Sequence, residues 1–254
     1  MTAYLSFCRK EFLENLRTYR LLIMLAVFAA FGLMSPLFAK MLPDLLSGMD
    51  MNGVVIEMPE STAFDSWTQF FKNNGQMGML VLIIVFCGIT ANEFTKGTLI
   101  PIVTKGMRRS TVILAKLTVS VLLWIVSYAV SLAVTWAYTI YFWGNTPLPN
   151  AFLAFVSLWL FGVLMIVLLV LGGICLGNIY GALLFSGGAV ILMALVSIAP
   201  PAAKYNPISL AGGVVNLLNG AQPASDFIPA LLICIGLILV GLIASLLIFN
   251  RKQL

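Results

Sequence analysis

The feature that most constrains this chain is a run of eighty-seven residues, 117–203, that contains no Asp, Glu, Lys or Arg. An ordinary water-soluble domain is about a quarter charged, whereas only 9% of this chain is charged and 61% is hydrophobic. These values exclude a soluble enzyme, a nucleic-acid-binding domain and a disordered linker, although the pI is near 9.1. We therefore predict an all-α integral membrane protein that has no nucleic-acid partner.

Six segments are long and apolar enough to cross a lipid bilayer as helices. A helix needs about 20 mainly apolar residues to cross roughly 30 Å of hydrocarbon. The third segment is the longest, and we expect it to tilt or to project into water. Residues 1–254 then form a single six-span transmembrane domain. The predicted spans are residues 21–39, 76–91, 112–141, 151–176, 180–199 and 227–249.

Basic residues are concentrated on one side of this predicted domain. Eleven of the fourteen Lys and Arg residues lie in the N-terminal arm, in the connection between the second and third spans, or in the C-terminal tail. The opposite side carries Lys40, Lys72 and Lys204 together with six acidic residues. Because cytoplasmic segments carry an excess of Lys and Arg, we predict a multi-pass protein of the cell membrane with both termini in the cytoplasm.

The N-terminal arm, residues 1–20, has the pattern of an amphipathic helix that lies in the cytoplasmic interface. Such a helix either anchors the chain and fixes its topology or also contacts a cytoplasmic partner. The predicted apolar face holds Leu5, Cys8, Phe12, Leu16 and Tyr19, and the opposite face holds Lys10, Glu14 and Arg17.

Two segments on the predicted outer side have features of their own. Residues 40–75 form an acidic loop, in which Phe64, Trp67 and Phe71 indicate a short interfacial helix within an aromatic belt. Residues 200–226 are broken by prolines and glycines, and their apolar centre is too short to cross the membrane. We expect a re-entrant hairpin there, with Pro207, Gly212 and Gly213 as candidates for an outer gate.

Several kinds of chemistry are excluded by residues that the sequence lacks. Without histidine, the chain has no imidazole for histidine-dependent hydrolysis or for metal and haem sites in the membrane. The predicted spans contain essentially no ionisable residues, which disfavours a proton- or sodium-coupled carrier. No GxxxxGK[ST] phosphate-binding loop is present. We expect no catalytic residue, metal or cofactor in this chain, so energy for uphill transport would come from another subunit.

The connection between the second and third spans is the most informative polar segment. Residues 92–116 read NEFTKGTLIPIVTKGMRRSTVILAK. Cytoplasmic topology alone accounts for the basic residues. It does not account for Glu93 or for the Gly97-Thr98 pair in the same stretch.

This segment resembles the first cytoplasmic loop of ABC-2-type exporter permeases. The resemblance lies in Glu93, Gly97-Thr98-Leu99, Arg108-Arg109 and Ala115-Lys116. In that family an acidic residue, a Gly-Thr and a basic cluster flank a short coupling helix that docks into the ATPase subunit. The resemblance implies a coupling segment at residues 92–111. Its site residues are Glu93, Lys96, Gly97, Thr98, Lys105, Arg108 and Arg109.

The resemblance also implies the partners and the activity. The chain would be a permease subunit that assembles with two ATPase subunits, which bind ATP and Mg. It would pair with a second copy of itself or with a similar permease. The apolar spans favour a hydrophobic or amphipathic substrate, and in the family this is often a peptide, a toxin or an antibiotic.

Two other classes of function stay open at this point. An ATP-independent secondary carrier or channel would need a polar or carbonyl-lined path through the spans. A membrane-embedded enzyme would need converging acid, base or nucleophile groups. The spans offer only isolated Ser, Thr, Tyr and Asn side chains, which usually bond to the helix backbone.

Overall fold

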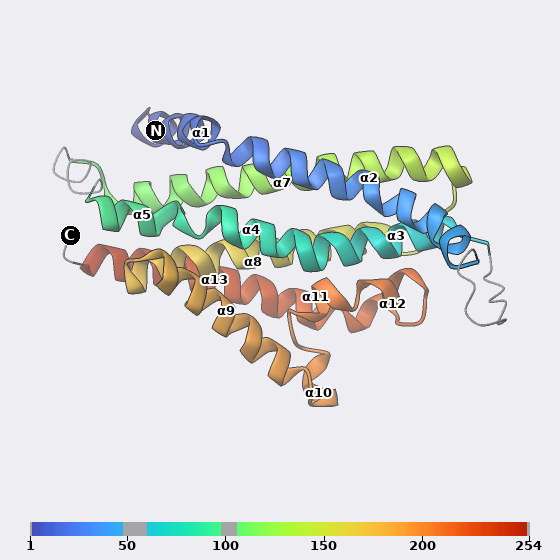
Figure 1. Ribbon diagram of the computed structural model, residues 1–254. Coiled ribbons are helices and arrows are strands. Elements are labelled where there is room, and N and C mark those ends of the chain that lie inside the picture. The colour runs from blue at the N-terminus through green and yellow to red at the C-terminus, as the bar shows by residue number, and fades with distance from the viewer. Residues whose placement is uncertain (1, 48–59, 98–105, 253–254) are drawn as a thin grey trace.

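The computed structural model describes residues 2–47, 60–97 and 106–252, and the regular structure in these ranges is helical throughout. Six segments are long and apolar enough to cross a membrane, which confirms the predicted number of spans: Arg20–Pro43, Ala63–Thr95, Arg109–Trp143, Ala151–Leu176, Ile179–Val196 and Ala224–Arg251. The start of the first helix and the end of the last lie at the same end of the bundle (Figure 1). We call it the terminal end, and the opposite end the distal end.

The first two helices are joined at a sharp bend. Helix α1 (Thr2–Arg17) and helix α2 (Arg20–Ser47) meet at Tyr19, whose backbone is left-handed with a φ of 59°. Helix α2 packs closely along α7 (Arg109–Trp143). Gly32 permits this contact, because a Cβ at that position would lie 2.7 Å from the carbonyl oxygen of Ser131.

The second span is a continuous helical rod that begins earlier than predicted. It consists of α3 (Ala63–Lys72), the π-helical segment η1 (Asn73–Gly78), α4 (Met79–Phe86) and α5 (Gly88–Lys96). The predicted loop at residues 40–75 is therefore wrong over residues 40–47, where α2 continues, and over residues 63–75. Trp67 and Phe71 are also buried against Phe155, so they do not form an aromatic belt. The short helix predicted around Phe64, Trp67 and Phe71 is present as α3, but it continues into the second span. Polar residues in and beside η1 concealed that continuation, because they interrupt the apolar pattern.

Helix α8 (Ala151–Leu176) forms the centre of the bundle. In an apolar stretch of 18 residues within α8, 67% of the residues are buried. The corresponding value is 17% in each of the spans that contain α9 (Ile179–Val196) and α13 (Ile228–Arg251). Helix α8 contacts the second span, α7, α9 and α13. A helix with neighbours on most sides is apolar on most sides, which explains the unbroken hydrophobic sequence of α8.

The segment between α9 and α13 is built from short helical pieces. These are α10 (Pro200–Ala203), α11 (Ser209–Gly212), α12 (Val214–Leu218) and the 3₁₀ turn η2 (Ala224–Asp226). Leu210, Val214 and Leu217 are fully buried, so α11 and α12 are packed into the bundle. Figure 1 shows α9 and α10 leaning away from the other helices. The predicted break at residues 200–226 is present, and its depth in a bilayer stays a prediction.

Candidate functional site

Three charged side chains meet inside the protein at the terminal end. The Lys116 ammonium on α7 lies 2.8 Å from a carboxylate oxygen of Glu11 on α1 and 2.9 Å from one of Glu93 on α5. All three residues are buried, with exposed fractions of 1%, 2% and 6% for Lys116, Glu11 and Glu93. A buried charge that loses its partner is strongly destabilising. This buried charge cluster therefore holds α1, α5 and α7 in one arrangement.

Lys10 and Glu14 form a half-exposed rim around the cluster. The Lys10 ammonium lies 2.8 Å from Glu11, 2.8 Å from Glu14 and 3.4 Å from Glu93. Burial alone would lower the pKa of Lys10, but hydrogen bonds to Glu11 and Glu14 raise it above its ordinary value. Burial alone would raise the pKa of Glu14, but Lys10 holds it below its ordinary value.

The same three carboxylates converge closely enough to hold a metal ion. The Lys10 ammonium already contacts Glu11, Glu14 and Glu93. A protein ammonium therefore supplies the positive charge that this group of carboxylates requires.

The face that α1 turns toward the bundle overlaps only one edge of the predicted apolar face. Phe7, Glu11 and Asn15 are buried, whereas Leu5 and Leu16 are 64% and 41% exposed. The docked face lies between the predicted apolar face and the predicted polar face, and Cys8 and Phe12 pack against the core at its edge. Glu11 docks because Lys116 offers it a buried partner. Because Leu5 and Leu16 are exposed, they are free to contact the membrane interface, and that contact stays a prediction.

Lys116 also contradicts the expectation that the spans hold essentially no ionisable group. It lies two helical turns after the start of α7, and its side chain is fully buried. Lys116 immediately precedes the charge-free run of residues 117–203, so that run did not reveal it. The sequence signal for this site is a lysine within an apolar helix, between Ala115 and Leu117. A buried ammonium needs a charged partner, so this lysine indicates a buried ion pair.

Glu93 is the least satisfied member of the buried charge cluster. Its second carboxylate oxygen, Oε2, is buried and has no hydrogen-bond partner among the described residues, and the same holds for the Thr90 hydroxyl one turn earlier. A buried polar group without a partner costs about 1–3 kcal/mol, and more when it is charged. The pairing of Glu93 is therefore the easiest in the cluster to rearrange.

Two further basic side chains cap helix C-termini at the terminal end. Arg109, at the start of α7, donates hydrogen bonds to the carbonyl oxygens of Phe249 and Asn250 at 3.0 and 3.3 Å. Lys252 donates to the carbonyl oxygens of Ile174 and Cys175 at the end of α8. The last carbonyls of a helix lack intrahelical partners and favour a nearby cation. These caps join α7 to α13 and the C-terminal tail to α8.

The structure separates the residues of the predicted coupling segment. Glu93 faces the interior and Arg109 contacts α13, whereas Arg108 is exposed just before α7. Gly97 ends α5 in the left-handed conformation, with a φ of 63°, which favours glycine. Thr98, Lys105 and the side chain of Lys96 lie outside the described residues.

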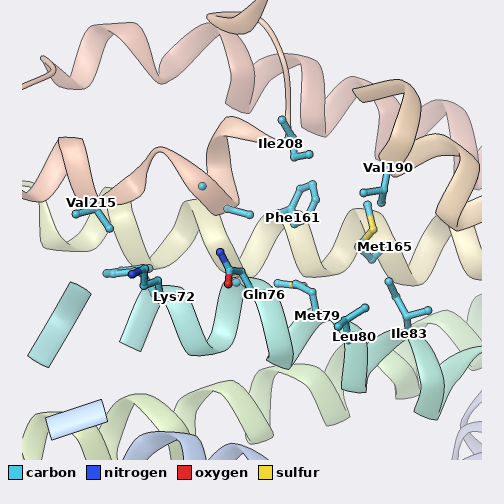
Figure 2. Close-up of a pocket in the computed structure, with 14 residues that line it drawn as sticks. Lys72, Gln76, Met79, Leu80, Ile83, Phe161, Met165, Val190, Ile208 and Val215 are labelled. Atoms are coloured by element: carbon cyan, nitrogen blue, oxygen red, sulfur yellow. The ribbon is translucent and has the colours of Figure 1, made fainter. Parts of the chain in front are cut away.

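A groove of about 310 Å³ lies between the second span, α8, α9 and α11 (Figure 2). Its polar residues are Lys72 and Gln76, at the end of α3 and in η1. The remaining side chains of its wall are apolar. They are Phe71, Met79, Leu80, Ile83, Phe161, Met165, Val190, Ile208, Ala211 and Val215.

The π-helical segment η1 divides its polar side chains between the bundle and the groove. Asn73 donates a hydrogen bond to Ser35 on α2 at 3.1 Å, and Ser131 on α7 donates to Asn74 at 3.2 Å. Lys72 and Gln76 line the groove. Single π-helical turns occur frequently at functional sites. No sequence pattern indicates this groove, because its wall gathers residues from four separate segments.

The residues of the predicted outer gate line three cavities, and their role in gating stays a prediction. Gly212 lines the groove beside η1. Pro207 lines a second cavity with Tyr205 and Asn206. Gly212 and Gly213 both line a third cavity with Lys204 and Asp226. Lys204 and Asp226 form an ion pair at 2.7 Å, which raises the pKa of Lys204 and links the two ends of the broken segment.

No protein-family model matches this chain, and no curated protein matches it in sequence. A functional interpretation therefore depends on the buried charge cluster, the helix caps and the groove. It also depends on the resemblance of residues 92–116 to a permease loop.

Proposed function

We propose that this chain is the transmembrane permease subunit of an ATP-driven ABC exporter of the ABC-2 type. The observation that carries the proposal is the buried charge cluster, in which Lys116 joins Glu11 on α1 to Glu93 on α5. The connection from α5 to α7 is the segment that resembles an ATPase-docking loop. Glu93 and Lys116 flank that connection, so a force applied to it reaches two spans through a buried ion pair.

The helix caps extend this connection to further spans. Arg109 joins the start of α7 to the end of α13, and Lys252 joins the tail after α13 to the end of α8. Movement at the α5–α7 connection is therefore shared among four spans. Rigid helices can carry such a movement to the distal end as a rigid-body rearrangement.

The proposed assembly contains two ATPase subunits, which bind ATP and Mg, and two permease subunits. The second permease is another copy of this chain or a similar sister. The proposed cargo is hydrophobic or amphipathic, with a peptide, toxin or antibiotic as the leading class, because the spans expose mainly apolar side chains. The proposed location is the cell membrane, with both termini in the cytoplasm.

The test is co-purification with an ATPase and control of its activity. A tagged chain is expressed with candidate ABC ATPase subunits from the same genome, purified as a complex and reconstituted in liposomes. We expect a stable complex with one of them and ATP hydrolysis that persists when the proton and sodium gradients are collapsed. Failure of every candidate ATPase to bind would contradict the proposal.

A pair of exposed arginines provides a matched comparison within this test. Arg108→Glu changes the exposed residue of the proposed docking segment, and Arg251→Glu changes an exposed residue at the end of α13. We expect the first variant to weaken ATPase binding and stimulation at least fivefold, with unchanged insertion, and the second to have little effect. Equal behaviour of the two variants would remove the coupling role from residues 92–111.

One observation favours a secondary carrier as the second candidate. Ionisable residues within spans form proton relays in pumps and transporters, and Lys116 is buried in α7 with two carboxylates nearby. Loss of transport after collapse of the proton gradient, at constant ATP, would establish this carrier instead of the exporter.

A further inference from the structure

We propose that the groove beside η1 binds a single-chain amphiphile with an anionic head group. The head group lies against Lys72 and Gln76, and the hydrocarbon chain lies along Met79, Leu80 and Ile83 (Figure 2).

The head-group end of the groove has the chemistry of an anion site. Lys72 and Gln76 are exposed and lie four residues apart, so they are neighbours on the helix surface. Within the described residues no carboxylate pairs with Lys72. An ammonium binds a carboxylate or phosphate through charge-assisted hydrogen bonds, and an amide can donate another. The charge of this end therefore favours an anion over a cation.

The rest of the groove fits one hydrocarbon chain. Met79, Leu80 and Ile83 form one wall, and Met165 of α8 and Val190 of α9 contribute to the others. The helix from Gln76 to Ile83 rises by about 10 Å. Methionine side chains adapt to flexible apolar ligands. A volume of about 310 Å³ is at the lower end of the range for small-molecule pockets, which suits a single chain better than a two-chain lipid or a folded peptide.

The groove is preformed and open at its side. A Cβ at Gly75 would lie 3.1 Å from the carbonyl oxygen of Ala211, so glycine allows α11 to close one wall. Leu80 is 55% exposed, so a chain can enter beside α4. A Cβ at Gly212 would meet no atom within 4 Å, which leaves free space at the groove wall contributed by α11.

The identification of this amphiphile with exported cargo rests on the proposed function, whereas the binding itself does not. As cargo, it would narrow the substrate class to a single alkyl chain that carries an anionic group. The binding test uses the chain without an ATPase. Its failure would leave the exporter proposal standing, and failure of an ATPase to co-purify would leave the binding site standing.

The probe is a long-chain fatty acid that carries a photoreactive diazirine in its alkyl chain. The purified full-length chain is placed in nanodiscs of zwitterionic lipid, irradiated with the probe and digested for mass spectrometry. We expect adducts on residues 79–83 of α4 and 161–165 of α8. An alkylammonium probe of the same length should label these positions at least fivefold less. Equal labelling by the two probes would overturn the head-group assignment.

Three variants locate the site. Lys72→Gln should lower labelling by the carboxylate probe roughly five- to tenfold, because it removes one charge-assisted contact. Gly212→Leu and Val190→Phe should fill the groove from two different helices and abolish labelling. The matched control is Gly236→Leu on α13, where a Cβ also meets no atom within 4 Å and which is not part of the groove wall. Unchanged labelling in both filling variants would overturn the proposed location.

Competition separates this amphiphile from other occupants. A short unlabelled fatty acid should displace the probe, whereas phosphatidylglycerol added to the nanodisc should not. Displacement by phosphatidylglycerol would assign the groove to a membrane lipid. Full protection of the groove in a cross-linked dimer would assign it to a second copy of the chain, and either result would overturn the proposal.

Discussion

The two ends of the helix bundle are held together by different chemistry. At the terminal end a few buried charges join the helices, and the Lys116 ammonium contacts two carboxylates at once. At the distal end many neutral groups join the first three spans. Ser66 lies 2.7 Å from the Thr139 hydroxyl, and the η1 asparagines bond to α2 and α7. Aromatic rings pack the second span against α8, namely Trp67, Phe70 and Phe71 of α3 and Phe155 of α8.

The difference lies in how the stabilisation is distributed. A buried charge that loses its partner is strongly destabilising. The packing of the helices at the terminal end therefore depends on each of these few charges. Hydrogen bonds between neutral groups in membrane proteins contribute about 0.6 kcal/mol each on average. The distal end therefore tolerates the loss of any one of them. Loss of one charged partner can therefore release the helices at the terminal end while the distal half stays assembled.

The largest expected effect comes from Lys116→Met, because it leaves Glu11 and Glu93 without their shared partner. We expect the free energy of unfolding to fall by about 3–5 kcal/mol, measured by SDS titration of the detergent-solubilised protein. Lys10→Met is the control, since its side chain is 42% exposed and its loss should cost much less. Adding Glu11→Gln and Glu93→Gln to Lys116→Met should recover most of the stability. Equal costs for Lys116→Met and Lys10→Met would contradict the comparison.

The next effect is that of Arg109→Gln, which removes a charged cap from the end of α13. We expect a loss of about 1.5–3 kcal/mol for hydrogen bonds to a charged group. Hydrogen exchange should accelerate locally in residues 249–252. Arg108→Gln is the matched control, because Arg108 is exposed. If exchange rises to the same degree in both variants, Arg109 does not act as the cap.

A smaller effect is expected at the distal end from Ser131→Ala, which removes the hydrogen bond to Asn74. The expected loss is about 0.6 kcal/mol, and at most about 1.7 kcal/mol, in the same SDS titration. Ser120→Ala provides the control, since Ser120 bonds to the backbone of its own helix. A cost for Ser131→Ala that rivals that of Lys116→Met would show that the distal end also depends on single residues.

The smallest effect concerns pH and the rim residue Glu14. Its pKa in the folded protein is below its ordinary value, so the stabilisation from its pairing is present above about pH 4.3. It is lost as the pH falls through the folded pKa. For this exposed i,i+4 pair we expect about 0.3–0.5 kcal/mol. The stability difference between wild type and Glu14→Gln should therefore vanish in acid. A difference that grows as the pH falls would reverse the assigned sign.

The sequence predicted the helical class and the six spans because apolar length depends on local composition. It missed the start of the second span because Asn73 and Asn74 look like loop residues. Their amides are satisfied by Ser35 and Ser131, which lie on other helices. Burial of a polar side chain depends on such a partner, and a hydropathy window cannot detect it.

The candidate site was predicted only in part for the same reason. Glu93 and Lys116 were noticed as members of a resemblance, but their ion pair was not. Glu11, the second partner of Lys116, lies 105 residues away in the chain. Helical periodicity separated an apolar face of α1 from a polar face without indicating that the arc between them, which holds Glu11, would meet a buried lysine. The groove was missed because its walls come from helices whose packing the sequence alone does not define.

The π-helical segment η1 has a consequence for the length of the second span. A π-helical turn accommodates one residue more than an α-helical turn. Deletion of one residue within 73–78 can therefore convert η1 to α-helix and keep the faces of α3 and α4 in phase. Deletion elsewhere in the span would rotate one part by about 100° relative to the other. A shortened η1 would disturb Asn73, Asn74 and Gln76, so a one-residue deletion there changes the groove wall while the faces of α3 and α4 stay in phase.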